Sequence, residues 1–98
     1  MAYAWNNLPN GVMSVTVNTV KFDYNPMADE LVAQKTGRRL YAFGNVTSLS
    51  LAEGIVTAIS SDLDGDAESL ALAVDPSIVV LTSLPVWYDV EQSWKLQE

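Results

Sequence analysis

The stretch "VMSVTVNTVKFDY", residues 12–24, decides how the fold begins. It is rich in valine, threonine and aromatic residues, which favour β-structure, so it predicts strand. Its apolar residues fall into an odd-numbered and an even-numbered phase: Met13, Val15 and Val17, then Val20, Phe22 and Tyr24. A strand that continued straight through would send half of them to the wrong face. We therefore expect a β-bulge or a tight turn near Asn18–Thr19.

The next stretch, "NPMADELVAQKTG" (residues 25–37), has two interpretations. Asn25 suits a helix N-cap, Pro26 suits the first helical position and Gly37 suits the C-terminal stop, so we predict a short helix. The alternative is a hairpin in which "ELVAQ" turns through "KTG" into "RRLYAF". In the helical interpretation, "RRLYAFG" (residues 38–44) is a strand by itself.

Two further helices are predicted in the second half of the chain. "SLAEGIVTAISSDL" (residues 50–63) starts with a candidate capping box, Ser50 with Glu53. It carries one apolar stripe at helical spacing: Leu51, Ile55, Val56, Ile59 and Leu63. "AESLALAV" (residues 67–74) predicts a shorter helix with Leu70, Ala71 and Val74 facing inward, ended by Pro76.

The end of the sequence reads as β-structure. "SIVVL" (residues 77–81) is a continuous apolar run typical of a buried strand, and Pro85 separates it from the last apolar stretch. "VWYDVEQSWKLQ" (residues 86–97) predicts one last strand or two short ones. The whole pattern predicts a single α+β domain over 1–98, mainly an antiparallel sheet with two or three short helices on one face. Residues 1–11 form an aromatic N-terminal arm and loop.

Composition excludes many functions. The 98 residues carry 12 acidic and 5 basic side chains, a net charge of -7, which disfavours binding to nucleic acid or anionic lipid. Cysteine and histidine are both absent, so thiolate and imidazole metal sites, thiol catalysis and Ser-His-Asp chemistry are unavailable to this chain. No apolar run is long enough to span a membrane, and the N-terminal residues lack the pattern of a secretory signal. We expect no cofactor, and a cytoplasmic or virion-associated location.

The acidic stretch "SDLDGDAES" (residues 61–69) is the one candidate metal site, formed by Asp62, Asp64, Asp66 and Glu68. A calcium loop of the EF-hand type needs Gly at its sixth position and Glu at its twelfth; counted from Asp62, these positions hold Ala67 and Ala73. A turn between two helices explains the stretch better. In that turn Gly65 supplies a left-handed stop and Asp66 caps the second helix.

Two groups of residues are candidates for a protein interface. Exposed tryptophan, tyrosine and arginine commonly anchor interfaces, and "KTGRR" gathers three of the five basic residues. The predicted interface residues are Tyr3, Trp5, Trp87, Trp94, Arg38 and Arg39. The alternative for the aromatic residues is that they cover the core of a small domain, and for the arginines that they pair with the chain's own acids.

These observations favour a non-catalytic subunit of a larger protein assembly, a homo-oligomer or a complex. A small virion component, such as a phage capsid-decorating, connector or tail protein, has this size and composition. The first alternative is an acidic inhibitor or immunity-type protein that covers a basic surface on an enzyme. The second is an enzyme that uses paired carboxylates, alone or with a divalent ion.

Overall fold

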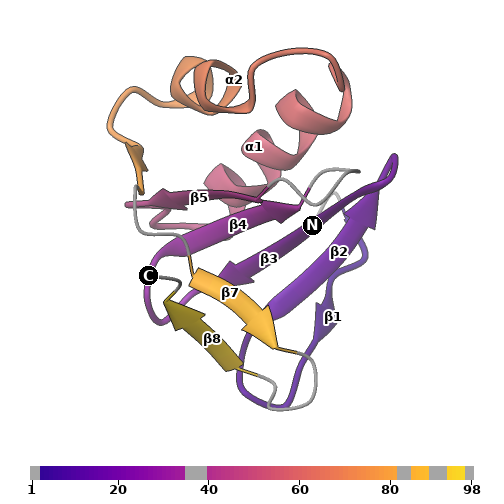
Figure 1. Ribbon diagram of the computed structural model, residues 1–98, viewed down its shortest axis with the longest axis vertical. Coiled ribbons are helices and arrows are strands. Elements are labelled where there is room, and N and C mark those ends of the chain that lie inside the picture. Colours follow the sequence, from indigo (N-terminus) through magenta and orange to yellow (C-terminus); the bar gives the residue numbers. More distant parts are fainter. Residues whose placement is uncertain (1–2, 35–39, 82–84, 89–92, 97–98) are drawn as a thin grey trace.

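The structure, a computed structural model, describes residues 3–34, 40–81, 85–88 and 93–96; Leu40 and the last two ranges are described by their backbone alone. Within these residues the chain forms a six-stranded antiparallel sheet, a separate two-stranded sheet and two helices (Figure 1). This arrangement confirms the predicted α+β fold with a mainly antiparallel sheet.

The strands of the large sheet are β1 (Asn6–Asn7), β2 (Met13–Val17), β3 (Val20–Asn25), β4 (Glu30–Gln34), β5 (Leu40–Gly44) and β6 (Val79–Val80). The helices are α1 (Leu49–Ser60) and α2 (Ala67–Val74), and the small sheet pairs β7 (Pro85–Tyr88) with β8 (Ser93–Leu96). Strand order in the large sheet follows the sequence, β1-β2-β3-β4-β5-β6, and both helices are inserted between β5 and β6. Neighbouring strands are therefore antiparallel throughout.

A two-residue turn at Asn18–Thr19 corrects the phase of the first hairpin, as the sequence predicts. Asn18 has φ 50° and Thr19 has φ 73°, the two left-handed positions of a type I′ turn. The turn pairs Val17 with Val20 and places Val15 opposite Phe22. Directly opposed residues share a face, so the two phases of apolar residues meet on one side of the sheet.

The prediction of a helix over residues 25–37 is wrong, and the alternative prediction of a hairpin is correct. Asn25 Oδ1 accepts a hydrogen bond from Met27 N at 3.1 Å, as a helix cap would, but the chain then makes a turn and enters β4. β4 lies between β3 and β5, with Leu31, Val32 and Ala33 all buried. Residues 35–39, which include the predicted stop at Gly37, lie outside the described residues.

Helix α1 forms where the apolar stripe predicts, but its start and end differ. Ser48, and not Ser50, is the N-cap, and its Oγ accepts from Leu51 N at 3.1 Å. The helix ends at Ser60, so Leu63 lies beyond it and is exposed. The predicted stripe therefore holds only as far as Ile59.

The turn between the helices and the end of α2 also differ in detail from the prediction. Gly65 does not take a left-handed conformation, and Asp66 stands at the N-cap of α2 without a side-chain capping bond. α2 ends at Val74, before Pro76, as predicted; Val74 is 37% exposed, but its Cγ1 lies 3.1 Å from the position of a Cβ at Gly54 of α1. The run 77–81 is a strand only at Val79–Val80, and the prediction that this strand is buried is wrong, because it forms an edge of the sheet and Val79 is 52% exposed.

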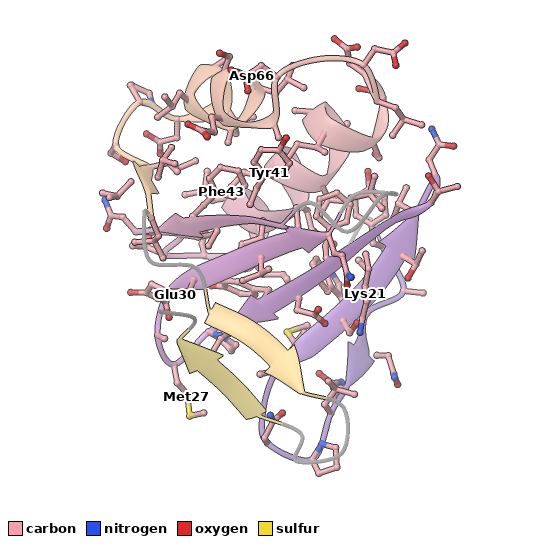
Figure 2. All side chains as sticks on the ribbon, viewed as in Figure 1. Lys21, Met27, Glu30, Tyr41, Phe43 and Asp66 are labelled. Atoms are coloured by element: carbon pink, nitrogen blue, oxygen red, sulfur yellow. The ribbon has the colours of Figure 1, made fainter. Side chains whose placement is uncertain are left out.

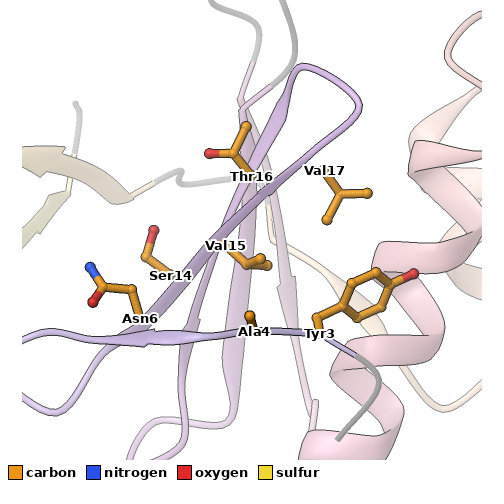
Figure 3. A pocket seen from close by; sticks show the side chains of 7 residues that line it. All are labelled: Tyr3, Ala4, Asn6, Ser14, Val15, Thr16 and Val17. Atoms are coloured by element: carbon orange, nitrogen blue, oxygen red, sulfur yellow. The ribbon is translucent and has the colours of Figure 1, made fainter.

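The core lies between one face of the large sheet and the two helices. That face, here called the helix face, presents apolar residues from every central strand. Its buried members include Val20, Phe22, Tyr24, Leu31, Ala33 and Phe43. α1 contributes Ala52, Ile55, Val56 and Ile59, and α2 contributes Ala67 and Ala71. The hairpin β7–β8 lies on the other side of the sheet from α1 (Figures 1 and 3).

Candidate functional site

A groove formed by described residues runs along the outer edge of β2. Its volume is about 530 Å³, and its lining residues are Tyr3, Ala4, Asn6, Ser14, Val15, Thr16 and Val17. None of these side chains is charged. Ser14 and Thr16 point away from α1, whereas Val17 and Tyr3 point toward it (Figure 3). The groove is therefore lined by Ser14 and Thr16 on one side and by Val17 and Tyr3 on the other.

The groove exists because the N-terminal arm pairs with β2 and then leaves it. β1 pairs Asn6 with Ser14 and Asn7 with Met13, and the residues before it turn toward α1. Two bonds hold the arm there: Tyr3 N donates to Glu53 Oε2 at 3.1 Å, and Trp5 Nε1 donates to the same oxygen at 3.0 Å. The carboxylate thus binds two donors of the arm at once.

The predicted interface residues Tyr3 and Trp5 both contact the core of their own chain. Trp5 is buried at 9% exposure, and its ring centroid lies 6.5 Å from that of Tyr24. Tyr3 is half-buried, and its hydroxyl lies 2.6 Å from Thr57 Oγ1. Their role as interface anchors stays a prediction, with Tyr3 the more accessible of the two.

The other predicted interface residues are placed only in part. Trp87 and Trp94 form a register pair across the β7–β8 hairpin, where the structure describes their backbone. Arg38 and Arg39 lie outside the described residues. The β2 edge itself was not identified from the sequence. The signal was available in the uncharged, proline-free run "SVTV" of residues 14–17, because such a run is typical of a strand able to pair further.

The acidic residues of the loop between α1 and α2 are exposed. Asp62, Asp64 and Asp66 are solvent-exposed, and Asp66 Oδ2 accepts from Ser69 Oγ at 2.7 Å. Gly65 N donates to Asp62 O at 3.1 Å, which closes a turn. Over the described part of the chain, no group of three or more acidic residues is close enough to hold a metal ion. The loop therefore presents separate carboxylates at one end of the molecule, where Figure 2 labels Asp66.

Helix α2 exposes apolar side chains on the surface turned away from the core. Leu72 is 39% exposed and Ala73 is also exposed, whereas the partly exposed Val74 turns toward Gly54 of α1. The opposite side of the helix is apolar too, because Ala67 and Ala71 are fully buried. An ordinary surface helix has a polar outer side, so α2 departs from that pattern in its last turn. We call Leu72 and Ala73 the outer face of α2.

Two titratable groups have shifted pKa values for identifiable reasons. Burial, with a smaller contribution from the nearby Asp29 carboxylate, raises the pKa of Tyr24 above 10.0. Its hydroxyl donates to Val46 O at 3.1 Å, a bond that requires the protonated form. Ser77 donates to Asp75 Oδ1 from its backbone N–H and its hydroxyl, at 2.9 and 2.8 Å, and these bonds lower the pKa of Asp75. The shift at Tyr24 therefore arises from burial and a nearby charge, and the shift at Asp75 arises from hydrogen bonds.

One buried acid lies on the sheet face opposite the helices. Asp23 is 3% exposed, and its Oδ2 lies 3.9 Å from Lys21 Nζ, two residues earlier on the same strand. The lysine side chain is 35% exposed, so the ion pair extends from the covered part of the face toward solvent.

Comparison with known proteins gives this chain no relatives: no family model, curated protein or solved structure matches it. Neither α1 nor α2, the two helices of the described residues, has the length and apolar content needed to cross a membrane.

Proposed function

We propose that this protein is a non-catalytic subunit that binds another protein through the outer face of α2. The observation that carries the proposal is the exposed apolar surface of Leu72 and Ala73. An apolar helix surface facing water is unfavourable, and a partner that covers it removes that cost. The chain's lack of thiol and imidazole fits this role, because a binding subunit needs neither.

Helix α2 is well placed to bind without disturbing the fold. It packs on α1 through small residues, Ala67 and Ala71, and Val74 Cγ1 comes within 3.1 Å of where a side chain at Gly54 would begin. This close packing holds the helix while leaving its outer face accessible. A small virion component, such as a capsid-decorating, connector or tail protein, is the kind of assembly subunit that matches the size and composition of the chain.

Native purification from the protein's own source tests the proposal. We expect the wild-type chain to elute and sediment in a complex well above its own 10.7 kDa, and Leu72→Glu to shift it to the free form. Ser50→Glu is the matched control, because it adds the same charge at an exposed position on α1. A wild-type protein that runs as the free chain in its native extract would refute the proposal. An equal loss of the complex with both variants would refute it too.

The second candidate is an acidic inhibitor that covers a basic surface. It is favoured by the exposed carboxylates of Asp62, Asp64 and Asp66 on one loop. Charge contacts of this kind weaken as salt screens them. A complex that dissociates in high salt, and that the triple variant Asp62→Asn, Asp64→Asn, Asp66→Asn cannot form, would favour this candidate. A complex unaffected by salt and lost with Leu72→Glu would favour the first.

A further inference from the structure

We propose that the open edge of β2 pairs with β2 of a second copy of this chain, antiparallel and centred on Thr16. The inference rests on the proposed function, since it names one partner of the assembly subunit. It uses a different surface from the outer face of α2. The contact would join the two six-stranded sheets edge to edge, with a two-fold axis perpendicular to the sheet at Thr16.

The free part of this edge is three residues long. β1 pairs only with Met13 and Ser14, so among the described residues Val15, Thr16 and Val17 have a strand neighbour on one side only, β3. The chain leaves the strand direction at Asn18, which has φ 50°. An antiparallel ladder of Val15 to Val17 with Val17 to Val15 of the second copy fills this stretch and is symmetric about Thr16.

Hydrogen bonding along β2 makes Thr16 the residue that faces outward. A two-residue turn is closed by a pair that exchanges both backbone bonds, here Val17 with Val20. Bonded pairs alternate along an antiparallel ladder, so Val15 also bonds to Phe22, whereas Thr16 does not bond to Lys21. The N–H and C=O of Thr16 therefore point into the groove. They can exchange both bonds with Thr16 of a second copy.

The edge of β2 is complementary to a second copy of itself. Each copy carries -7, which opposes association in general, but the groove lining is uncharged and brings no carboxylate into the contact. The two-fold axis keeps both helix faces on the same side, so Val15 lies beside Val17 of the other copy and Thr16 beside Thr16. Such β-branched cross-strand pairs are favourable. β2 also lacks the lysine and proline that commonly protect an exposed edge from pairing.

A ladder this short gives a weak contact, so we expect the free chain to be monomeric at micromolar and dimeric at millimolar concentration. Amide hydrogen exchange of the wild-type protein tests the geometry without mutation. The Thr16 amide should exchange freely in dilute solution and roughly tenfold more slowly when concentrated. The amides of Val15 and Val17 should be protected at both concentrations, because they bond to β3. A Thr16 exchange rate that does not change with concentration would overturn the proposal.

Thr16→Pro removes the outward N–H and leaves the ladder with β3 intact, as proline is tolerated on edge strands. Sedimentation should show that it stays monomeric at millimolar concentration, while Thr16→Ala, which keeps the N–H, associates as the wild type does. Association of Thr16→Pro equal to wild type would contradict the edge contact. If Thr16→Pro fails to fold, the exchange experiment decides alone. Both proposals remain separable, because loss of this contact leaves the effect of Leu72→Glu on the native complex unchanged.

Discussion

The two faces of the six-stranded sheet are buried in different ways. The helix face is apolar, with Phe22, Leu31 and Phe43 fully buried beneath the two helices and the N-terminal arm. The opposite face is mixed, yet Asp23 and Val32 are also buried at its centre. On that side Leu81 Cδ2 lies 3.3 Å from the position of a Cβ at Gly44, and the hairpin β7–β8 lies beyond (Figure 1).

This difference between the faces explains why β4 is difficult to recognise as a strand from the sequence. A strand with one covered face alternates apolar and polar residues, as β2 does over "SVTV". β4 is covered on both faces, so Leu31, Val32 and Ala33 are apolar in succession and the period of two is lost. Met27, which lies within the segment predicted as a helix, instead projects from the turn at 78% exposure (Figure 2).

The largest effect on stability should come from truncating a large side chain on the helix face. Phe43→Ala should lower the free energy of unfolding by about 3–5 kcal/mol, because Phe43 is fully buried and the helices cannot collapse into the space. Val32→Ala on the opposite face should cost only about 2 kcal/mol, since it removes two methylene equivalents and a smaller cavity. Urea unfolding of both variants measures the difference. Equal losses would show that the two faces contribute alike.

The next effect concerns the arm that closes the helix face. Glu53→Gln should destabilise by about 1–2 kcal/mol, because Tyr3 N and Trp5 Nε1 then lose a charged acceptor. Glu30→Gln is the control, since Glu30 is a half-exposed acid of β4, and it should stay within about 0.5 kcal/mol of wild type. The intrinsic fluorescence of the tryptophans should report loosening of Trp5 in the first variant alone. A wild-type stability for Glu53→Gln would rule out this anchoring role.

A substitution in the Asn18–Thr19 turn, which sets the sheet face of each residue in β2 and β3, should raise the free energy of unfolding instead of lowering it. Thr19→Gly should stabilise by about 1 kcal/mol, because threonine at φ 73° is strained and glycine is not. Asn18→Gly should bring no such gain, since Asn18 Nδ2 donates to Ser60 O at 2.8 Å and the variant loses that bond. Thermal unfolding compares the two. A destabilised Thr19→Gly would mean that the Thr19 side chain contributes more than its backbone strain costs.

The smallest effect is a pH dependence that originates on the helix face. The pKa of Tyr24 is raised on folding, so the native state keeps this proton where the unfolded chain releases it. The stabilisation is complete below about pH 10 and is lost as the pH rises from there through the native pKa. Stability followed across that range should fall more steeply for wild type than for Tyr24→Phe, which has no such proton. Parallel curves of stability against pH would show that groups other than Tyr24 cause the loss of stability at high pH.

The sequence by itself determined the elements whose signals are local. The phase change at Asn18–Thr19 required a turn, because side chains in a strand alternate with a fixed period. The spacing of Ile55 and Ile59 determined α1, since apolar residues four apart share one side of a helix. The lack of cysteine and histidine determined which chemistry the chain can carry, and no fold can change that.

Only the tertiary structure decided the elements that depend on distant partners. Residues 30–34 became a strand because β3 and β5 hydrogen-bond to them from both sides, which outweighs a favourable local cap at Asn25. Glu53 became the anchor of Trp5, 48 residues away, although its spacing from Ser50 suggested a capping box. The edge of β2 stayed open because the arm turns toward Glu53. The differences in local propensity between helix and strand are smaller than the free energy gained from strand pairing and burial together.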